Sequence, residues 1–160
     1  MIDSTTLQKL IHLSWQSAGA AARKAWPEGT RMSAPEVEAF LAQERFCAIA
    51  TTGLNRVPHL VPGSFVNDRD ATFWLPTVAG AVRLADLRSH PKAAVLVGQG
   101  VAATHALVMA RGVVEKFAPD DVPGRVRAAA RAKLGDTSWA ALWLALRPER
   151  LIAYSRAAVE

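Results

Sequence analysis

The sequence predicts a mainly β fold, an antiparallel barrel with flanking helices, and two observations support this prediction. From residue 46 onward the chain consists of short runs rich in β-branched and aromatic residues, which are typical of strands. The runs cover residues 46–52, 57–67, 71–75, 93–98, 105–117 and 151–155. Turn residues at 53–55 and 67–70 separate the first three runs as hairpins. This spacing of short strands and turns indicates an antiparallel barrel.

Helical patterns occupy the N-terminal part of the chain and two later segments. Apolar residues recur at helical spacing over residues 6–26, which predicts one amphipathic helix. A capping box at Ser33 and Glu36, with Pro35 in the first turn, predicts a second helix directly before the first strand. We expect further helices over 79–89 and 120–134, whereas the pattern of 139–146 fits either a helix or a strand.

Length and composition indicate one globular domain. The chain has 160 residues, of which 51% are hydrophobic and 21% charged, a balance that suits one packed core. Charged residues or glycine interrupt each apolar stretch before the roughly 18 residues that a membrane span needs. The first eight residues also lack the pattern of a secretion signal. We therefore expect a cytoplasmic protein without membrane contact, in which the one cysteine, Cys47, is a buried structural thiol.

The charge of the chain favours an anionic partner. The formal net charge is +5, but the basic residues are spread along the chain and mixed with acids, without a run of Lys or Arg. This distribution argues against nucleic-acid binding. A small phosphorylated molecule suits the charge equally well.

Motifs of several enzyme classes are missing from the sequence. We find no Walker loop, no GxGxxG, no GxSxG and no HExxH. The histidines at 12, 59, 90 and 105 lie in separate segments without metal-ligand spacing, so we predict no metal site and assign no catalytic residue. His59 is the most interesting of the four, because it follows Pro58 in a predicted strand and can face a pocket.

Two local patterns can hold an anion. Residues 75–87 run from a strand through small residues into a helix, where Thr77, Arg83 and unpaired helix amides suit a phosphate. The alternative is that Thr77 caps a surface helix and Arg83 is solvated. At the end of the first strand, the hydroxyls of Thr51 and Thr52 can hold a polar ligand tail, or these residues simply lead into a turn.

Taken in order, these pieces resemble the FMN-binding split-barrel family, which includes the pyridoxamine 5'-phosphate oxidases. The resemblance covers about residues 33–155. It depends on the ordered set Cys47-Ala-Ile-Ala-Thr-Thr52, Phe73-Trp-Leu75, His90-Pro-Lys-Ala-Ala-Val95, Arg111-Gly112-Val-Val-Glu115 and the ending Leu146-Arg-Pro-Glu-Arg-Leu-Ile-Ala-Tyr154. It implies a six-stranded antiparallel split β-barrel of the FMN-binding type over residues 33–160, with residues 1–32 as an additional N-terminal helical extension.

The resemblance also implies a cofactor and a set of residues that hold it. Members of the family form homodimers with flavin sites at the interface and use FMN or a deazaflavin, while some relatives bind heme. The positions that receive the cofactor phosphate are similar to Thr77, Ala81 and Arg83. Thr51 and Thr52 correspond to the strand end that meets the ribityl-phosphate tail. The strand whose backbone approaches the ring contains His59 and Pro62.

Departures from the family pattern shape the functional hypothesis. Residues 59–65 lack the basic residues of true pyridoxamine-phosphate oxidases, and residues 81–83 read Ala-Val-Arg where those enzymes have Ser-Arg-Lys. Oxidation of vitamin B6 is therefore disfavoured. The leading hypothesis is an FMN- or deazaflavin-dependent oxidoreductase that acts on a small molecule. The alternatives are a non-catalytic protein that sequesters flavin, heme or another tetrapyrrole, and a structural dimer without a cofactor.

Overall fold

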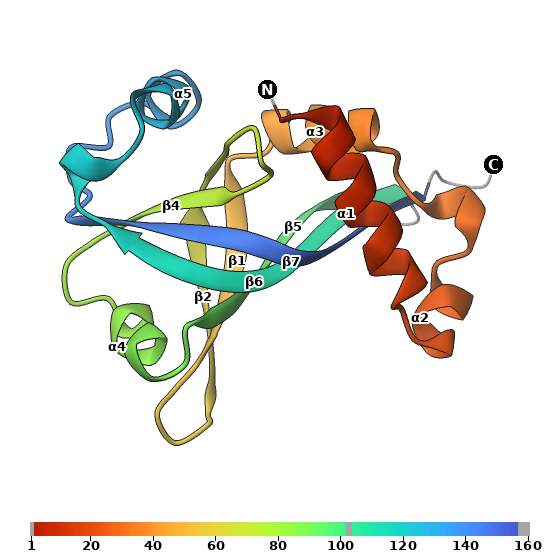
Figure 1. Ribbon diagram of the computed structural model, residues 1–160, viewed down its shortest axis with the longest axis horizontal. Coiled ribbons are helices and arrows are strands. Elements are labelled where there is room, and N and C mark those ends of the chain that lie inside the picture. The colour runs from red at the N-terminus through yellow and green to blue at the C-terminus, as the bar shows by residue number, and fades with distance from the viewer. Residues whose placement is uncertain (1, 102–103, 157–160) are drawn as a thin grey trace.

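The computed structural model describes residues 2–101 and 104–156, which form a curled antiparallel sheet with helices around it (Figure 1). The strands in this part of the chain are hydrogen-bonded in the order β2-β1-β5-β6-β7-β4-β3. Their bounds are β1 Phe46–Thr52, β2 Pro58–Ser64, β3 Val66–Asn67, β4 Phe73–Thr77, β5 Lys92–Val101, β6 Thr104–Phe117 and β7 Leu142–Arg156. The predicted mainly β fold with flanking helices is confirmed. The described sheet has one strand more than the expected six, because the predicted strand 57–67 divides at Phe65.

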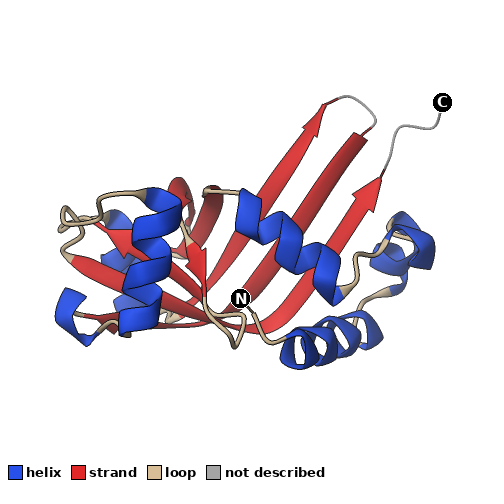
Figure 2. Cartoon of the chain, turned by 90° about the horizontal axis from the view of Figure 1, so that it is seen from above, coloured by secondary structure: helices blue, strands red, loops and turns tan. Residues whose placement is uncertain are grey.

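Helices lie outside the curled sheet, as Figure 2 shows. Figure 1 places α1, α2 and α3 toward one end of the molecule and α4 and α5 toward the other. Their bounds are α1 Ser4–Gln16, α2 Ala20–Ala25, α3 Ala34–Gln43, α4 Val82–Ser89 and α5 Gly124–Leu134, with short 3-10 helices at Glu28–Thr30 and Pro119–Asp121. The predicted capping box of α3 is present. The side chain of Ser33 accepts the backbone N–H of Glu36, and the side chain of Glu36 accepts the backbone N–H of Ser33.

The prediction of one helix over residues 6–26 is wrong, because the chain forms α1 and α2 with a break between them. The N–H of Ser17 still donates to the carbonyl of Leu13 at 3.1 Å, and the helix ends there. Gly19 then adopts an extended conformation before α2 begins. Glycine disfavours a helix interior by about 1 kcal/mol relative to alanine, and burial of Ala18 in the core fixes the bend.

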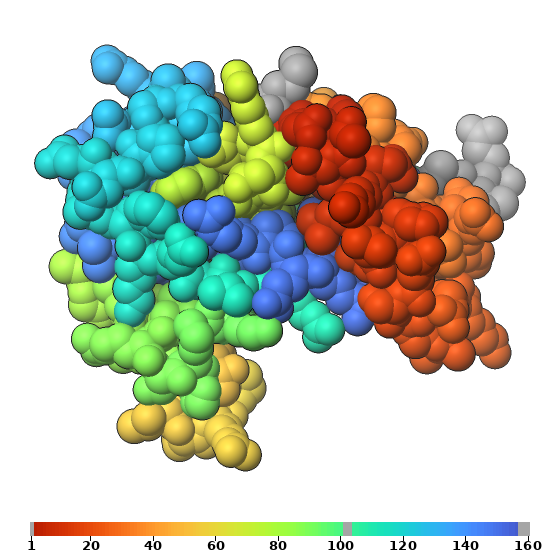
Figure 3. Space-filling model, in the orientation of Figure 1, coloured from red at the N-terminus to blue at the C-terminus, as the bar shows by residue number. Residues whose placement is uncertain are grey.

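The N-terminal helices share one hydrophobic core with the barrel. Leu7 and Trp15 of α1 are buried in the same cluster as Phe73 of β4. The Oγ of Ser14 accepts the buried backbone N–H of Leu151 at 2.8 Å, which ties α1 to β7. Figure 3 shows the N-terminal residues, in red and orange, covering one end of the molecule. The boundary at residue 32 between extension and barrel domain stays a prediction.

The long β6–β7 pairing contains a bulge that the sequence did not reveal. Arg111 pairs with Arg150 and Gly112 pairs with Pro148, so Glu149 is an extra residue on β7. Proline lacks a backbone donor and is tolerated in a strand at such a bulge. The predicted strand 151–155 is therefore only the second half of β7, and the ambiguous segment 139–146 leads into its first half.

Candidate functional site

The start of α4 forms the first part of the candidate site. Residues 78–81 connect β4 to α4, and Gly80 in this loop has a φ of 73°, which is the left-handed region that favours glycine. Ala81 is the N-cap residue and offers no side-chain acceptor. The alternative in which Thr77 caps the helix is wrong, because Thr77 is fully buried and its hydroxyl donates to the carbonyl of Leu75 at 3.1 Å. The N–H of Leu84 donates to the carbonyl of Ala81 at 2.9 Å, whereas within the described residues the amides of Val82 and Arg83 are left for an anion or water.

Arg83, in the first turn of α4, is half-buried rather than solvated. Its Nη2 donates to the Oγ1 of Thr77 at 3.2 Å. Its Nε is buried and has no hydrogen-bond partner within the described residues. Burial lowers the pKa of Arg83 from its ordinary value, because a charged group loses solvation inside the protein. The guanidinium is therefore held against Thr77 and still has donor capacity for an anionic ligand.

Asp86, which no pattern in the sequence indicates as a site residue, connects three elements of the candidate site. This carboxylate lies one turn after Arg83, and the residue is only 4% exposed. Its Oδ2 accepts the hydroxyl of Thr51 at 2.6 Å and lies 2.8 Å from the Nδ1 of His59. The bond from Thr51, followed by that from His59, lowers the pKa of Asp86 below 3.8. Helix α4 is therefore tied to the end of β1 and to the start of β2.

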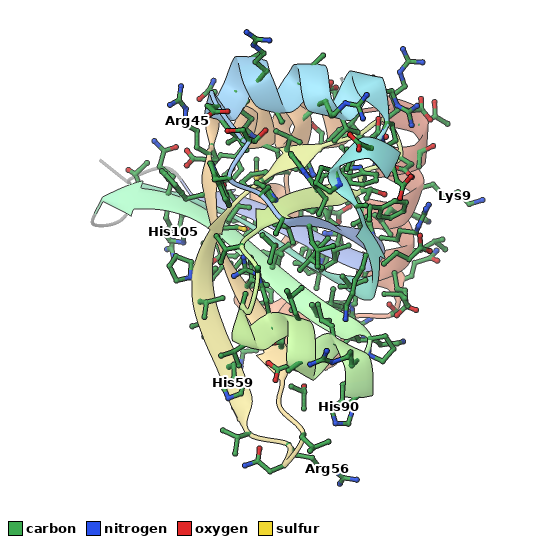
Figure 4. All side chains as sticks on the ribbon, turned by 90° about the vertical axis from the view of Figure 1, so that its left-hand side faces the viewer. Lys9, Arg45, Arg56, His59, His90 and His105 are labelled. Atoms are coloured by element: carbon green, nitrogen blue, oxygen red, sulfur yellow. The ribbon has the colours of Figure 1, made fainter. Side chains whose placement is uncertain are left out.

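The ring of His59 is held in one orientation. Its Nδ1 is bonded to Asp86, and the side chain is 39% exposed. On the side of its Cε1 the ring lies against Gly53, where a Cβ would be only 3.0 Å away. Figure 4 shows His59 and His90 near the same end of the molecule, close to the β1–β2 hairpin and α4. Within residues 2–101 and 104–156 the Nε2 of His59 makes no hydrogen bond, so it is available to a ligand.

The predicted cofactor residues divide between the two faces of the sheet. Side chains alternate along a strand, so Thr51 and His59, which pair across β1 and β2, face the interior and α4. Thr52 and Pro62 lie on the outer face. The structure thus brings Thr51 and His59 together through Asp86, and Thr77 together with Arg83. It does not bring Thr52 or Pro62 into either cluster.

An apolar groove of about 550 Å³ runs along the outer face of the sheet. Its floor comes from β2, β1, β5, β6 and β7, and α2 with Trp26 forms one wall. At one end it continues into a polar groove of about 810 Å³, where the lining includes the hydroxyl residue Thr52 and three cationic side chains, Lys92, Arg111 and Arg150. No pattern in the sequence predicts either groove, because both depend on strands far apart in the chain.

Other groups in the described residues offer little for chemistry. Cys47 is buried as predicted, and burial raises the pKa of its thiol to about 12. Across residues 2–101 and 104–156, no three His, Cys, Asp or Glu side chains lie close enough together to hold a metal ion. In the same residues no helix is long and apolar enough to cross a membrane.

The sequence profile of the pyridoxamine 5'-phosphate oxidase family matches residues 33–155. The chain belongs to this family. The match begins at the cap of α3 and ends within β7, so it covers every strand of the barrel. It confirms the family resemblance that the ordered sequence segments indicated. No curated protein matches the sequence.

Solved structures of low sequence identity share the fold. The conserved protein Rv2991 of Mycobacterium tuberculosis has a TM-score of 0.69 at 20% identity, with 83% of this chain and 95% of that chain covered. HutZ, the heme storage protein of Vibrio cholerae, gives 0.64 at 16% identity, covering 76% and 93%. An FAD-binding protein of Mesorhizobium loti gives 0.63 at 20% identity, covering 79% and 96%. At these identities the likeness establishes the split-barrel fold of the family and leaves the reaction open.

Proposed function

We propose that this protein binds FMN, or a deazaflavin of similar shape, at the junction of β1, β2 and α4 and acts as an oxidoreductase on a small molecule. One observation carries the proposal. Asp86 of α4 joins Thr51 and His59, and Arg83 of the same helix contacts Thr77. The residues expected to hold the cofactor, except Thr52 and Pro62, therefore lie on α4, at its N-cap or in contact with it. The FAD-binding relative of the same fold supports a flavin ligand.

The residues at this junction fit the phosphate end of a flavin nucleotide. The uncapped amides of α4 and the unpartnered Nε of Arg83 are donors for an anion. Ala81 leaves the approach to these donors open, because its side chain is a single methyl group. A bound flavin supplies two-electron hydride chemistry, while the protein contributes binding, orientation and electrostatics. Because the flavin carries the reacting atoms, the protein needs no nucleophile of its own, and the sequence contains no motif of nucleophilic catalysis.

Within this proposal each polar residue has a separate role. Arg83 neutralises the phosphate, and Thr77 holds the guanidinium in place by accepting a hydrogen bond from its Nη2. Asp86 fixes Thr51 and the ring of His59. The free Nε2 of His59 can then hold a proton or accept one close to the ligand. We also propose a homodimer, since Phe46 of β1 and Leu54 of the β1–β2 turn are 70% and 82% exposed and apolar surface of this kind favours association.

Heme storage is the competing candidate function, and one observation favours it. A histidine whose Nδ1 is held by a carboxylate is the usual arrangement of a ligand that binds iron through Nε2, and His59 with Asp86 matches it. The uncapped, cationic start of α4 suits the phosphate of FMN better than the propionate carboxylates of heme, because the phosphate carries more charge and more acceptor oxygens. Flavin is therefore the better-supported ligand. A Soret band that forms with heme and disappears in His59→Ala would reverse this order.

The role of Arg83 in this proposal predicts a loss of FMN affinity when its charge is removed. We expect Arg83→Ala to weaken FMN binding roughly tenfold, because one charge-assisted contact to the phosphate is lost. The measurement is quenching of flavin fluorescence during titration of the cofactor-stripped protein. Arg88→Ala is the matched control, since Arg88 lies exposed at the end of the same helix. Equal affinity of the Arg83→Ala variant and the wild type would exclude the phosphate assignment.

A further inference from the structure

The floor of the apolar groove consists of two cross-strand rows of side chains. Each row crosses five neighbouring strands, from β2 through β1, β5 and β6 to β7. The first row is Leu60, Ala50, Ala94, Arg111 and Arg150, and the second is Pro62, Ala48, Leu96, Met109 and Ile152. The hollow exists because three positions at the centre of these rows are alanines. Trp26 also lines the groove and forms an aromatic wall beside this floor.

Two arginines face each other directly at one end of the first row. Arg111 and Arg150 pair across β6 and β7, and like charges in such a position repel each other. The Nη2 of Arg150 donates to the carbonyl of Ser14 at 3.3 Å, but its Nε is buried without a partner within the described residues. Arg111 is exposed, and its side chain makes no hydrogen bond or ion pair in that part of the chain. Both arginines line the groove, and the exposed guanidinium of Arg111 has its donors unused.

No acid in the grooves neutralises this pair. The charged residues that line the two grooves are Lys92, Arg111, Arg150 and Glu149. Glu149 is already engaged, because the Nζ of Lys92 lies 2.8 Å from its Oε2. The apolar floor thus ends at two uncompensated guanidinium groups. This charge distribution is complementary to a ligand with an apolar body and one anionic end.

We propose that the two connected grooves bind an amphipathic organic acid as substrate. Its apolar body lies over Ala50 and Ala94 beside Trp26, and its carboxylate or phosphate lies between Arg111 and Arg150. The substrate role rests on the proposed function, because the polar groove reaches Thr51, whose hydroxyl donates to Asp86 in the candidate cofactor site. Binding itself needs no flavin. A second copy of the chain fits this groove less well, since an apolar protein surface would leave the two arginines uncompensated.

A pair of fluorescent probes tests this proposal with the full chain. 8-Anilinonaphthalene-1-sulfonate has an apolar body and one anionic group, and N-phenyl-1-naphthylamine is the same body without that group. We expect Arg111→Gln and Arg150→Gln to weaken binding of the sulfonate roughly tenfold each and to leave binding of the neutral probe unchanged. Arg131→Gln is the control, because Arg131 is exposed on α5 away from the groove.

A second variant tests whether the probes bind in the free volume above the alanines of the groove floor. Ala94→Leu fills the centre of the floor, so we expect it to weaken both probes, while its far-ultraviolet circular dichroism stays that of the wild type. Equal losses of both probes in the arginine variants, or no loss of the sulfonate, would overturn the anion site. Probe affinity that falls as the protein concentration rises would instead assign the groove to a second copy of the chain.

Titration with FMN separates this inference from the proposed function. We expect Arg111→Gln to leave FMN affinity unchanged and Arg83→Ala to leave sulfonate affinity unchanged. Loss of FMN affinity in Arg111→Gln would show that the groove holds the cofactor, and the substrate site would be refuted. Absence of FMN binding together with selective loss of the sulfonate would refute the proposed function and retain the anion-binding groove.

Discussion

Replacement of Gly112 by alanine is expected to destabilise the fold by about 3 kcal/mol or more. A Cβ at this position would overlap the carbonyl oxygen of Arg147 and would lie 2.9 Å from the backbone nitrogen of Glu149. Both atoms belong to the backbone of the β7 bulge, so no side-chain rotation relieves the contact. Urea unfolding followed by circular dichroism measures the change in the free energy of unfolding.

Gly124→Ala is the matched control for this prediction. Gly124 opens α5, has an ordinary negative φ and has no atom within 4 Å of its missing Cβ. Alanine there is expected to be neutral or slightly stabilising, because it restricts the unfolded chain. If Gly112→Ala were as stable as Gly124→Ala, the bulge at Gly112 and Pro148 would not exist as described.

Asp86→Ala is expected to lower the free energy of unfolding by about 3 kcal/mol. The substitution removes the acceptor of the buried Thr51 hydroxyl and of the His59 ring, and each lost bond to a charged acceptor costs about 1.5–3 kcal/mol. Asp120→Ala, which changes an exposed acid on the short helix before α5, is the control. A double-mutant cycle with Thr51→Val locates the interaction. Additive losses in that cycle would mean that the two side chains do not act through each other.

The contribution of Asp86 also has a defined dependence on pH. Thr51 and then His59 lower the pKa of this carboxyl in the folded state below its ordinary value of 3.8. Its stabilising contribution is therefore complete above that value and is lost as pH falls through the folded pKa. The difference in stability between the wild type and Asp86→Asn should stay constant near neutral pH and shrink below about pH 4. A difference that does not change with pH in acid would contradict an ionised Asp86.

Local chemistry explains which parts of the fold were predictable. The strand 46–52 was predicted with its observed bounds, because it is a short run with β-branched residues and a turn signal after it. The first half of β7 was left open between helix and strand, since its Leu, Ala and Trp residues favour a helix as much as a strand. The break at residues 17–19 also escaped prediction. Its cause is the burial of Ala18 against the barrel, which only the tertiary structure reveals.

The candidate site was predictable only in part for a similar reason. Thr77 and Arg83 were found because both lie within one short segment. They are also in contact in the structure, because the first turn of α4 brings the guanidinium of Arg83 to Thr77 at the end of β4. Asp86 was not found, because a single acid in a helix has no distinctive pattern until the fold places it against β1 and β2. The Arg111 and Arg150 pair depends on the register of two strands, which the bulge shifts by one residue.

The most direct test of the central claim compares FMN with riboflavin, which lacks the phosphate, on the cofactor-stripped wild type and on Arg83→Ala. We predict that the wild type binds FMN roughly a hundredfold more tightly than riboflavin, because both the α4 amides and Arg83 contact the phosphate. The difference should fall to roughly tenfold in Arg83→Ala. Equal affinity of the wild type for FMN and riboflavin would contradict a phosphate site at the start of α4.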